Sequence, residues 1–289
     1  MITARAFAGK HYAVYGLARS GLATVEALLA SGAKVTAWDS EEEARAKLPP
    51  GAELVDLDSA DLSQFDSLVV TPGLPLNRHP IAQRARDAGV EIIGDIELFA
   101  RARPELPPHK VVGITGTNGK STTTALIHHI LKTAGVPTTM GGNIGLPILA
   151  QDPLPEGGVY VLELSSYQID LTQSLDCDLA LLLNITPDHL DRYDAIEAYR
   201  GSKMRLFALQ SSSNIAVFTG EDQFAYDAYQ DRWAGAHDTT VLARGDDADE
   251  QEQWPALQGP HNAQNAAAAM AVCKALGIAE DPIKLGLRT

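Results

Sequence analysis

The chain has 289 residues, of which 45% are hydrophobic and 21% charged, and its 37 acidic against 23 basic side chains give a formal net charge of −14. At roughly 150 residues per domain, this length predicts two domains, each with its own core. The acidic balance argues against nucleic acid or an anionic membrane surface as the main partner, because both require a positive field. Any anionic ligand must therefore be held by local features.

Targeting signals and cysteine chemistry are not indicated. The sequence has no run of about 18 apolar residues, and residues 1–7 lack the apolar stretch of a signal peptide, so we expect a cytoplasmic protein. Cys177 and Cys273 lie in apolar surroundings without the spacing of metal ligands. We expect two buried, reduced thiols.

In the first part of the chain, β-branched runs alternate with helical patterns of about a dozen residues, which predicts βαβ units around a parallel sheet and an α/β fold. We expect a helix that is capped by Ser20, ends at Leu29 and is closed by Gly32. Three prolines within residues 103–108 favour a linker without a helix or a central strand. Residues 1–105 are therefore predicted to form a Rossmann-like domain, with strands at 12–15, 34–38, 67–70 and 91–93.

A second α/β series is predicted for residues 106–285. A glycine-rich turn after its first strand, at residues 113–121, makes it a candidate ATP-binding domain of the P-loop type. Its acidic stretch at 245–252 is predicted to be a solvated loop. The expected strands and alanine-rich helix lie at 111–114, 160–164, 179–183 and 262–276, respectively.

Residues 113–121, Gly-Ile-Thr-Gly-Thr-Asn-Gly-Lys-Ser, follow an apolar strand and open a helix. In such a turn, backbone N–H groups converge on phosphate oxygens, Lys120 reaches the β- and γ-phosphates, and the Ser121 hydroxyl can join Mg²⁺. The strict P-loop pattern has glycine at the position of Ile114, whereas here the glycine is Gly116. The alternative is a turn that merely connects strand and helix, but the Gly-Lys-Ser ending favours a mononucleotide, ATP. Asn118 is typical of a turn former.

These residues resemble the ATP loop of the Mur ligases and their relative folylpolyglutamate synthase, which join an amino acid to a carboxylate at the expense of ATP. The resemblance implies ATP contacts throughout the loop, by Gly116, Thr117, Asn118, Gly119, Lys120, Ser121 and Thr122.

Two polar residues, Glu163 and His189, lie near the carboxyl ends of apolar strands. Glu163 is the single carboxylate of its strand, and burying an ionised Glu without a partner costs several kcal/mol, so we expect a cation or a dense hydrogen-bond shell. The alternative is an edge-strand Glu that faces solvent. For His189 a role as metal ligand is favoured over a structural one. Asp188 and Asp191 are candidates for supporting residues that contact the ligands of the metal, and for Asp191 a role in helix capping is equally favoured. Because the carboxyl ends of parallel strands meet at one edge, we predict a Mg²⁺·ATP site there.

The resemblance extends to these segments, since Glu163 and His189 fall on magnesium-binding positions of the Mur ligases. Residues 199–203 match the family segment whose lysine is carbamylated; Lys203 alone would be read as a surface residue. An anionic carbamate made from CO₂ can bind Mg²⁺. The resemblance implies two Mg²⁺ ions, one near Ser121 and Glu163 and the other near His189 and carbamylated Lys203. It also implies that the catalytic residues are Lys120, His189 and Lys203.

The first glycine turn, residues 16–21, lies between the first strand and the first helix, and Asp39 ends the second strand. This is the layout of a dinucleotide fold, but Ala18 replaces the middle glycine, which weakens an NAD interpretation. The domain instead resembles the Mur ligase branch that binds UDP-N-acetylmuramoyl-L-alanine and adds D-glutamate. Supporting stretches are 71–73, 94–99, 141–145 and 163–168.

That resemblance implies substrate contacts in both domains. Arg19 and Ser20 are expected at the diphosphate, Asp39 and Ser40 near uracil, Gly73 in the nucleotide site, and Asn143 at the muramoyl part. His189 is also expected among the residues that bind the UDP substrate. Residues 259–265 resemble the start of the family's helix at adenine, with Asn265 on the adenine-contacting position. Helix capping is an equally favoured role for His261 and Asn262.

The implied reaction is amide-bond formation in peptidoglycan precursor synthesis. ATP phosphorylates the alanyl carboxylate, the amine of D-glutamate attacks the acyl phosphate, and phosphate leaves. In the family a third, C-terminal domain holds the acceptor, and residues 286–289 lie where its linker begins, so we expect a monomeric chain that binds the UDP substrate but is nearly inactive alone. The alternatives are another Mur-type ligase, an NAD-dependent oxidoreductase and a P-loop ATPase that acts as a switch.

Overall fold

The computed structural model describes residues 1–188, 192–245 and 250–289 and divides the chain into two compact units. Unit 1 contains Met1–Leu106, Leu146–Pro153 and Asp170–Leu175. Unit 2 contains Pro107–Gly145, Leu154–Ile169 and Asp176–Thr289. The first passage of the chain between the units thus lies one residue from the expected boundary, but two later segments return to unit 1.

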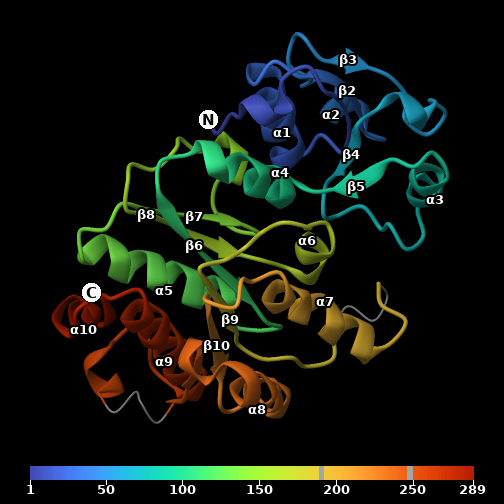
Figure 1. Cartoon of the computed structure of the whole chain (residues 1–289). Coiled ribbons are helices and arrows are strands. Elements are labelled where there is room, and N and C mark those ends of the chain that lie inside the picture. Colours follow the sequence, from blue (N-terminus) through green and yellow to red (C-terminus); the bar gives the residue numbers. More distant parts are fainter. Residues whose placement is uncertain (189–191, 246–249) are drawn as a thin grey trace. The chain divides into compact units, whose positions relative to one another are not determined.

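Unit 1 is built on a five-stranded parallel sheet with the order β3-β2-β1-β4-β5 (Figure 1). The chain order reverses between β1 and β4, which is the position where open α/β sheets bind ligands. The strands are β1 (His11–Tyr15), β2 (Lys34–Trp38), β3 (Glu53–Leu54), β4 (Ser67–Val70) and β5 (Glu91–Ile93), and the helices are α1 (Arg19–Ala30), α2 (Glu42–Arg45), α3 (Pro80–Asp87) and α4 (Asp95–Ala102).

Two local expectations for unit 1 are wrong. Ala18, not Ser20, is the N-cap of α1, because the glycine turn already ends there and Ser20 falls inside the first helical turn. Arg103–Glu105 form a short 3-10 helix at the start of the proline-containing segment. A proline in the first turn of a helix is tolerated because its missing N–H has no partner to lose there.

A buried carboxylate holds residues 170–175 in unit 1. Glu97 on α4 is 1% exposed and accepts hydrogen bonds from Gln173 N (2.7 Å), Ser174 N (2.9 Å), Ser174 Oγ (2.8 Å) and Arg101 Nε (2.8 Å). The backbone N–H of Gly94 also donates to Leu171 O at 3.1 Å. These bonds satisfy the carboxylate and the returning backbone together.

Unit 2 contains a six-stranded parallel sheet with the order β11-β10-β9-β6-β8-β7 (Figure 1). Its first strand, β6, lies between β8 and β9, so the loop after β6 is at a switch point of the sheet. The strands are β6 (His109–Thr115), β7 (Thr138–Gly142), β8 (Gly158–Glu163), β9 (Leu179–Leu182), β10 (Ile215–Thr219) and β11 (Thr240–Ala243). The helices are α5 (Lys120–Thr133), α6 (Ser166–Asp170, at the edge of the unit), α7 (Ile196–Ala208), α8 (Gln223–Ala236), α9 (Pro260–Ala275) and α10 (Glu280–Arg288). The parallel α/β architecture predicted from the sequence is confirmed.

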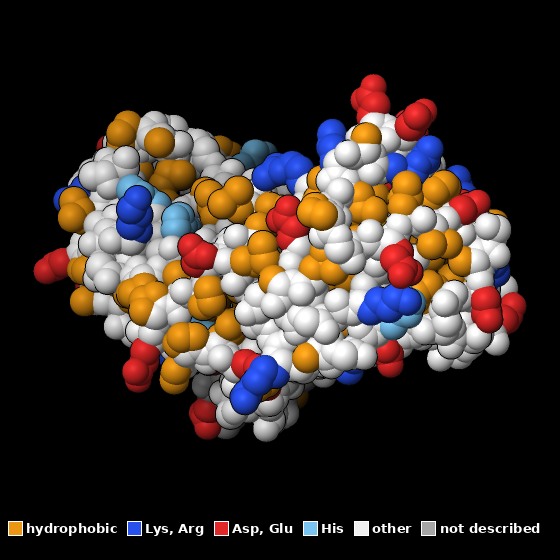
Figure 2. All heavy atoms as spheres, turned by 90° about the horizontal axis from the view of Figure 1, so that it is seen from above, with side chains coloured by type: hydrophobic (Ala, Val, Ile, Leu, Met, Phe, Trp, Pro, Cys, Tyr) orange, Lys and Arg blue, Asp and Glu red, His pale blue; other side chains and the backbone are white. Residues whose placement is uncertain are grey.

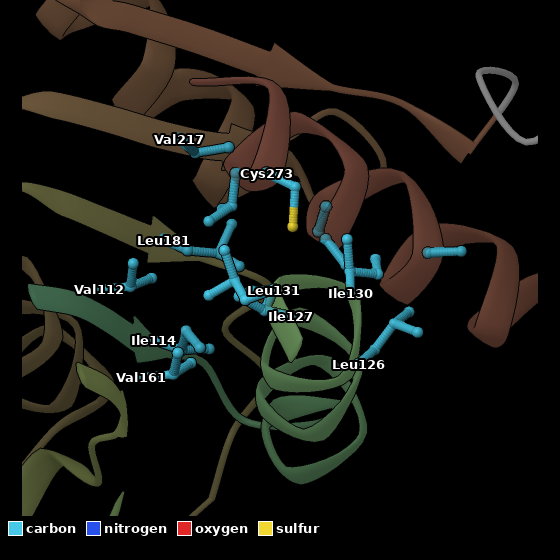
Figure 3. Packing of buried hydrophobic residues seen from close by; sticks show 14 of the residues in the cluster. Val112, Ile114, Leu126, Ile127, Ile130, Leu131, Val161, Leu181, Val217 and Cys273 are labelled. Atoms are coloured by element: carbon cyan, nitrogen blue, oxygen red, sulfur yellow. The ribbon is translucent and has the colours of Figure 1, made fainter. Parts of the chain in front are cut away.

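The main core of unit 2 lies between its sheet and helices α5 and α9 (Figure 3). Ile127 and Leu131 of α5 are fully buried in one cluster with Ile114 and Leu181 of the strands, and Cys273 of α9 completes it. On the opposite side, Phe207 of α7 stacks on Phe218 of β10, with ring centroids 4.8 Å apart. Both cysteines are buried and free, as predicted.

The described part of the acidic stretch includes a short helix and ion pairs, which a solvated loop would not have. Residues 246–249 lie outside the described part of the chain, but Gln251–Gln253 form a 3-10 helix. Glu250 pairs with Lys284 at 3.2 Å and with Arg288 at 3.1 Å, because both basic side chains project from α10.

The described helices are too short or too polar for any of them to cross a membrane. On the face shown in Figure 2, Lys and Arg side chains occur in small groups interspersed with Asp and Glu.

Candidate functional site

The loop after β6 has the backbone that a phosphate-binding turn requires. Gly116 and Gly119 have φ values of +152° and +84°, and Gly119 is the N-cap of α5. A Cβ at Gly119 would lie 2.3 Å from Oδ1 of Asn265. The left-handed backbone conformation therefore favours glycine at this position, and a larger residue would also have to displace the Asn265 amide.

The segment that follows β9 fixes the loop from one side. Asn184 accepts two loop hydrogen bonds, from Thr117 N to its carbonyl and from Asn118 N to its Oδ1, both at 2.8 Å, and its Nδ2 donates to Asn118 O at 3.0 Å. Thr186 N donates to Thr117 Oγ1 at 3.1 Å. Asn118 is thus a braced turn residue. Sequence reasoning missed Asn184 and Thr186; the signal available was their place directly after a buried strand.

Lys120 lies at the start of α5 with its ammonium group folded over the loop. Its Nζ donates to the carbonyls of Gly116 (2.9 Å) and Thr117 (2.8 Å). Burial lowers the pKa of Lys120, and the negative charges of Glu163 and Asp188 oppose that shift. Ser121 and Thr122 in the same turn are exposed.

Glu163 is the last residue of β8 and is 1% exposed. Its Oε1 accepts a hydrogen bond from Asn143 Nδ2 at 3.0 Å, whereas its Oε2 is buried without a hydrogen-bond partner. The alternative of a solvent-facing edge strand is wrong, because β8 lies between β6 and β7. A buried carboxylate oxygen without a donor fits a site for a cation, since the unpaired charge is otherwise costly.

Lys203 on α7 is buried, with 1% exposure, and is not a surface residue. Its Nζ donates to Gly116 O at 2.8 Å, the same carbonyl that accepts from Lys120, and lies 4.6 Å from the ring centroid of Tyr199. The Tyr199 hydroxyl is hydrogen-bonded to Thr117 Oγ1 at 3.2 Å. Lys203 is therefore tied to the phosphate loop directly and through Tyr199.

The other predicted metal ligands are only partly described. His189 lies outside the described residues, as does Asp191, whereas Asp188 is exposed. Within residues 1–188, 192–245 and 250–289, three or more His, Cys, Asp or Glu side chains do not gather into a cluster suited to a metal ion.

An aromatic column next to the loop was missed from the sequence. Tyr167 stacks on Tyr193 with centroids 6.0 Å apart, and Tyr193 contacts Tyr199 at 5.5 Å. Cations lie over both ends, Arg192 above Tyr167 at 4.3 Å and Lys203 above Tyr199. The available signal was the presence of tyrosines at positions 167, 193 and 199, in or next to the segments that carry the candidate magnesium ligands.

A hollow of about 440 Å³ opens beside the phosphate loop. Asn265 is 8% exposed and does not line it; its Oδ1 accepts from Thr123 Oγ1 at 3.3 Å and its Nδ2 donates to Asn262 Oδ1 at 3.4 Å. A contact of Asn265 with adenine stays a prediction. The hollow is lined by Asn118, Leu183, Asn184, Thr186, Thr219, Glu221, Asp222, His261 and Gln264.

In unit 1 the glycine turn leads from β1 into α1. Gly16 has a φ of +100°, and a Cβ at Gly21 would lie 1.8 Å from Gly16 O, so the helix starts in close contact with the turn. The Asp39 carboxylate accepts hydrogen bonds from Leu17 N (2.6 Å) and Glu41 N (2.9 Å). The Asp39 carboxylate thus stabilises the glycine turn between β1 and α1.

The other predicted contacts of unit 1 follow the carboxyl ends of β1, β2 and β4, the edge at which such sheets bind ligands. Ser20 is half-buried, and Arg19, Ser40 and Gly73 are exposed. Asn143 belongs to unit 2.

Comparison with known proteins identifies both halves of the chain. A model of the Mur ligase middle domain matches residues 114–255, and a model of the MurD-like N-terminal domain of Mur ligases matches residues 10–94. Among solved structures, a UDP-N-acetylmuramate:L-alanyl-gamma-D-glutamyl-meso-diaminopimelate ligase from Neisseria meningitides has a TM-score of 0.62 at 18% identity, covering 97% of this chain and 98% of that one. UDP-N-acetylmuramate-alanine ligase MurC from Thermotoga maritima has a TM-score of 0.55 at 21% identity, covering 96% and 68%. These likenesses show a shared fold.

Similarity in sequence is much higher to proteins named UDP-N-acetylmuramoylalanine--D-glutamate ligase. The Sphingopyxis alaskensis protein is 62% identical over 290 residues, which are 100% of this chain and 66% of the relative. The corresponding proteins of Novosphingobium aromaticivorans and Zymomonas mobilis are 61% and 57% identical, with 97% and 99% of this chain and 64% and 68% of the relatives covered. The chain spans about two thirds of the length of these relatives. It belongs to the Mur ligase family, in the branch of the UDP-N-acetylmuramoylalanine--D-glutamate ligases.

Proposed function

We propose that the chain supplies the ATP site and the UDP-substrate site of a ligase that joins D-glutamate to UDP-N-acetylmuramoyl-L-alanine. The observation that carries the proposal is the phosphate loop with Lys120 beside the buried, half-satisfied carboxylate of Glu163. The names of the relatives support the identity of the substrates.

ATP is bound at the N-terminus of α5. The loop N–H groups and the helix dipole favour phosphate, and the exposed hydroxyls of Ser121 and Thr122 are within the first helical turn. Lys120 exchanges its two carbonyl acceptors for phosphate oxygens, where its charge stabilises the transferring group. The neighbouring hollow of about 440 Å³ accommodates the nucleoside.

The residues at the end of β8 fit a divalent cation. Mg²⁺, when bound, neutralises negative charge on the phosphates. We assign Glu163 Oε2 and the Ser121 hydroxyl as ligands of one ion, and His189 with Lys203 as ligands of a second. Asn143 orients Glu163 through its bond to Oε1.

For Lys203 to be a ligand, its amine must add CO₂ and release a proton, which gives an anionic carbamate. Its burial and its hydrogen bond to Gly116 O beside the phosphate loop support this assignment. Intact-mass measurement under CO₂ should show an increase of one CO₂ that is absent from Lys203→Arg. An unmodified lysine at ample CO₂ would contradict it.

Unit 1 holds the UDP part of the substrate, with the diphosphate at the N-terminus of α1 near Arg19 and Ser20, uracil near Asp39 and Ser40, and Gly73 lining the site. Asn143 is the proposed contact of the muramoyl part, and His189 is a further proposed contact of the UDP substrate. NAD is disfavoured, because Ala18 stands where a dinucleotide-binding turn has its middle glycine.

In the reaction, the alanyl carboxylate attacks the γ-phosphorus of ATP and ADP leaves. The amine of D-glutamate then attacks the acyl phosphate, loses a proton and expels phosphate, which leaves the amide. The chain's residues position the reactants and stabilise charge. We place this reaction in the cytoplasm, where ATP and nucleotide-linked sugars occur, and in a monomer.

Calorimetry with the 289-residue chain tests the proposal. We expect saturable binding of UDP-N-acetylmuramoyl-L-alanine and of Mg²⁺·ATP, and none of NAD. Lys120→Ala should weaken Mg²⁺·ATP binding at least about tenfold, or 1.4 kcal/mol. Lys110→Ala, an exposed lysine at the opposite end of β6, is the matched control. Tight NAD binding without UDP-substrate binding would refute the proposal.

A further inference from the structure

Asp95 is a buried carboxyl group that the proposed mechanism does not use. It is the first residue of α4 and is 5% exposed, and its Oδ1 accepts a hydrogen bond from Ile96 N at 3.0 Å. Its side chain lines a hollow of about 10 Å³, about the size of one water molecule. Ser20, Gly21 and Thr24, in the first turns of α1, line the same hollow.

The hollow therefore joins two helix N-termini. α4 carries Asp95 as its own first-turn acidic residue, and α1 presents the turn that contains Ser20, which we assign to the diphosphate site. The Asp95 carboxylate thus shares this hollow with the first turn of α1, the end of the helix at which backbone N–H groups give a positive potential. A bound diphosphate would bring a second anion to that helix end.

Among the described residues, charged side chains other than Asp95 itself do not line this hollow. The remaining lining residues, Val14, Val69, Val70, Thr71 and Pro72, do not titrate. Burial raises the pKa of Asp95 to about 6, and the backbone N–H groups of Ile96 and Asp95 itself oppose the shift. The shift has no contribution from the titratable and charged groups on the elements packed around Asp95: His11, Tyr12 and Tyr15 on β1, Arg19 and Glu26 on α1, Glu97 and Arg101 on α4, and Arg103 and Glu105 on the 3-10 helix after α4.

We propose that Asp95 takes up one proton from solvent when the diphosphate of the UDP substrate binds at the N-terminus of α1, a proposal that rests on the function assigned to unit 1. Two anions at one partly desolvated helix end repel each other, and protonating the carboxylate removes the repulsion. The bound state therefore holds more protons than the free state, so binding weakens as the pH rises above the pKa of Asp95.

The test is a pair of calorimetric titrations with UDP-N-acetylmuramoyl-L-alanine, whose diphosphate is a diester and does not titrate near neutrality. Titrations in phosphate and in Tris, two buffers of different ionisation enthalpy, give the number of protons taken up. We expect wild type to take up a substantial fraction of a proton at about pH 7 and its Kd to rise about threefold or more between about pH 6 and pH 8.

Asp95→Asn keeps the shape of the side chain and mimics the neutral acid. We expect it to take up less than about a tenth of a proton and to keep its Kd within about twofold over the same range. Asp87→Asn, an exposed carboxylate on α3, removes the same charge from the same unit and should behave as wild type. The wild-type proton count stands even where a variant fails to fold.

The inference is overturned if wild type takes up no proton, or if Asp95→Asn takes up as much as wild type. Absence of UDP-substrate binding at every pH would overturn both the inference and the proposed function of unit 1. Binding that does not depend on pH would overturn the inference alone.

Discussion

Two carboxylates of equal burial should respond in different ways to the same substitution. Glu97 and Glu163 are each 1% exposed. Glu97 accepts four hydrogen bonds, whereas Glu163 accepts one, from Asn143, and leaves Oε2 without a donor. The perturbation is Glu→Gln at each position, which removes the charge and keeps the size.

The magnitudes follow from these hydrogen bonds. A glutamine at position 97 has one acceptor oxygen for four donors, and its NH₂ group meets N–H groups, so the free energy of unfolding should fall by about 2 to 4 kcal/mol. At position 163 the single bond from Asn143 can be kept by the amide oxygen. The attraction to Lys120 that is lost is offset by the relief of a buried charge, so the change should stay below about 1 kcal/mol.

The assay is urea denaturation in EDTA, combined with nucleotide titrations. Glu163→Gln should weaken Mg²⁺·ATP binding at least about tenfold and leave nucleotide binding without Mg²⁺ unchanged, whereas Glu97→Gln should leave both constants unchanged in the folded protein. The reasoning would be refuted if Glu163→Gln lowered stability as much as Glu97→Gln, or if it left Mg²⁺·ATP binding intact.

Three further changes test the geometry. Gly119→Ala should lower the free energy of unfolding by about 1 to 3 kcal/mol and reduce nucleotide affinity, because the residue has a positive φ and its Cβ would lie 2.3 Å from a side-chain oxygen. Gly201→Ala, on α7 with open space around it, should raise the free energy of unfolding by about 0.5 to 1 kcal/mol. Denaturation curves that shift in the same direction for both variants would contradict this. Asp95→Asn should raise the free energy of unfolding at about pH 7 by about 1 to 3 kcal/mol, because ionising the wild-type carboxyl is harder in the folded state than in the unfolded state. The gain should vanish below about pH 4, where the acid is neutral in both states. An equal gain at both pH values would show that the burial of the Asp95 charge is not its cause. Tyr199→Phe removes the bond to Thr117 Oγ1 and should raise the Kd for Mg²⁺·ATP about three- to tenfold by titration calorimetry, and an unchanged Kd would show that this bond does not position the loop.

The central strands could be predicted because parallel strands buried on both faces are nearly continuous apolar runs. Edge strands were harder: Glu53–Leu54 has two exposed residues, and Thr138–Gly142 contains two glycines. Ile215–Thr219 carries a clear apolar signal that the sequence analysis did not use. Ser20 was misassigned as a cap because the turn before α1 ends two residues earlier than its spacing suggests.

The phosphate loop and Glu163 could be found from the sequence because each signal is local, a turn before a helix and a lone carboxylate in an apolar strand. The burial of Lys203 and its contact with Gly116 depend on how α7 packs, which spacing does not encode. Asn184 braces the loop only because β9 pairs with β6, a long-range fact of sheet order. Asp95 lies in the stretch 94–99 that supports the family resemblance, but its burial arises from tertiary packing and could not be predicted.

The return of residues 170–175 to unit 1 limits how relatives can exchange parts. A chimera joined only within the proline-containing segment would take Glu97 from one parent and Gln173 and Ser174 from the other. A graft of unit 1 must therefore carry three stretches of sequence, 1–106, 146–153 and 170–175. Recombination in this family is expected to preserve these stretches together, as a discontinuous block of inheritance.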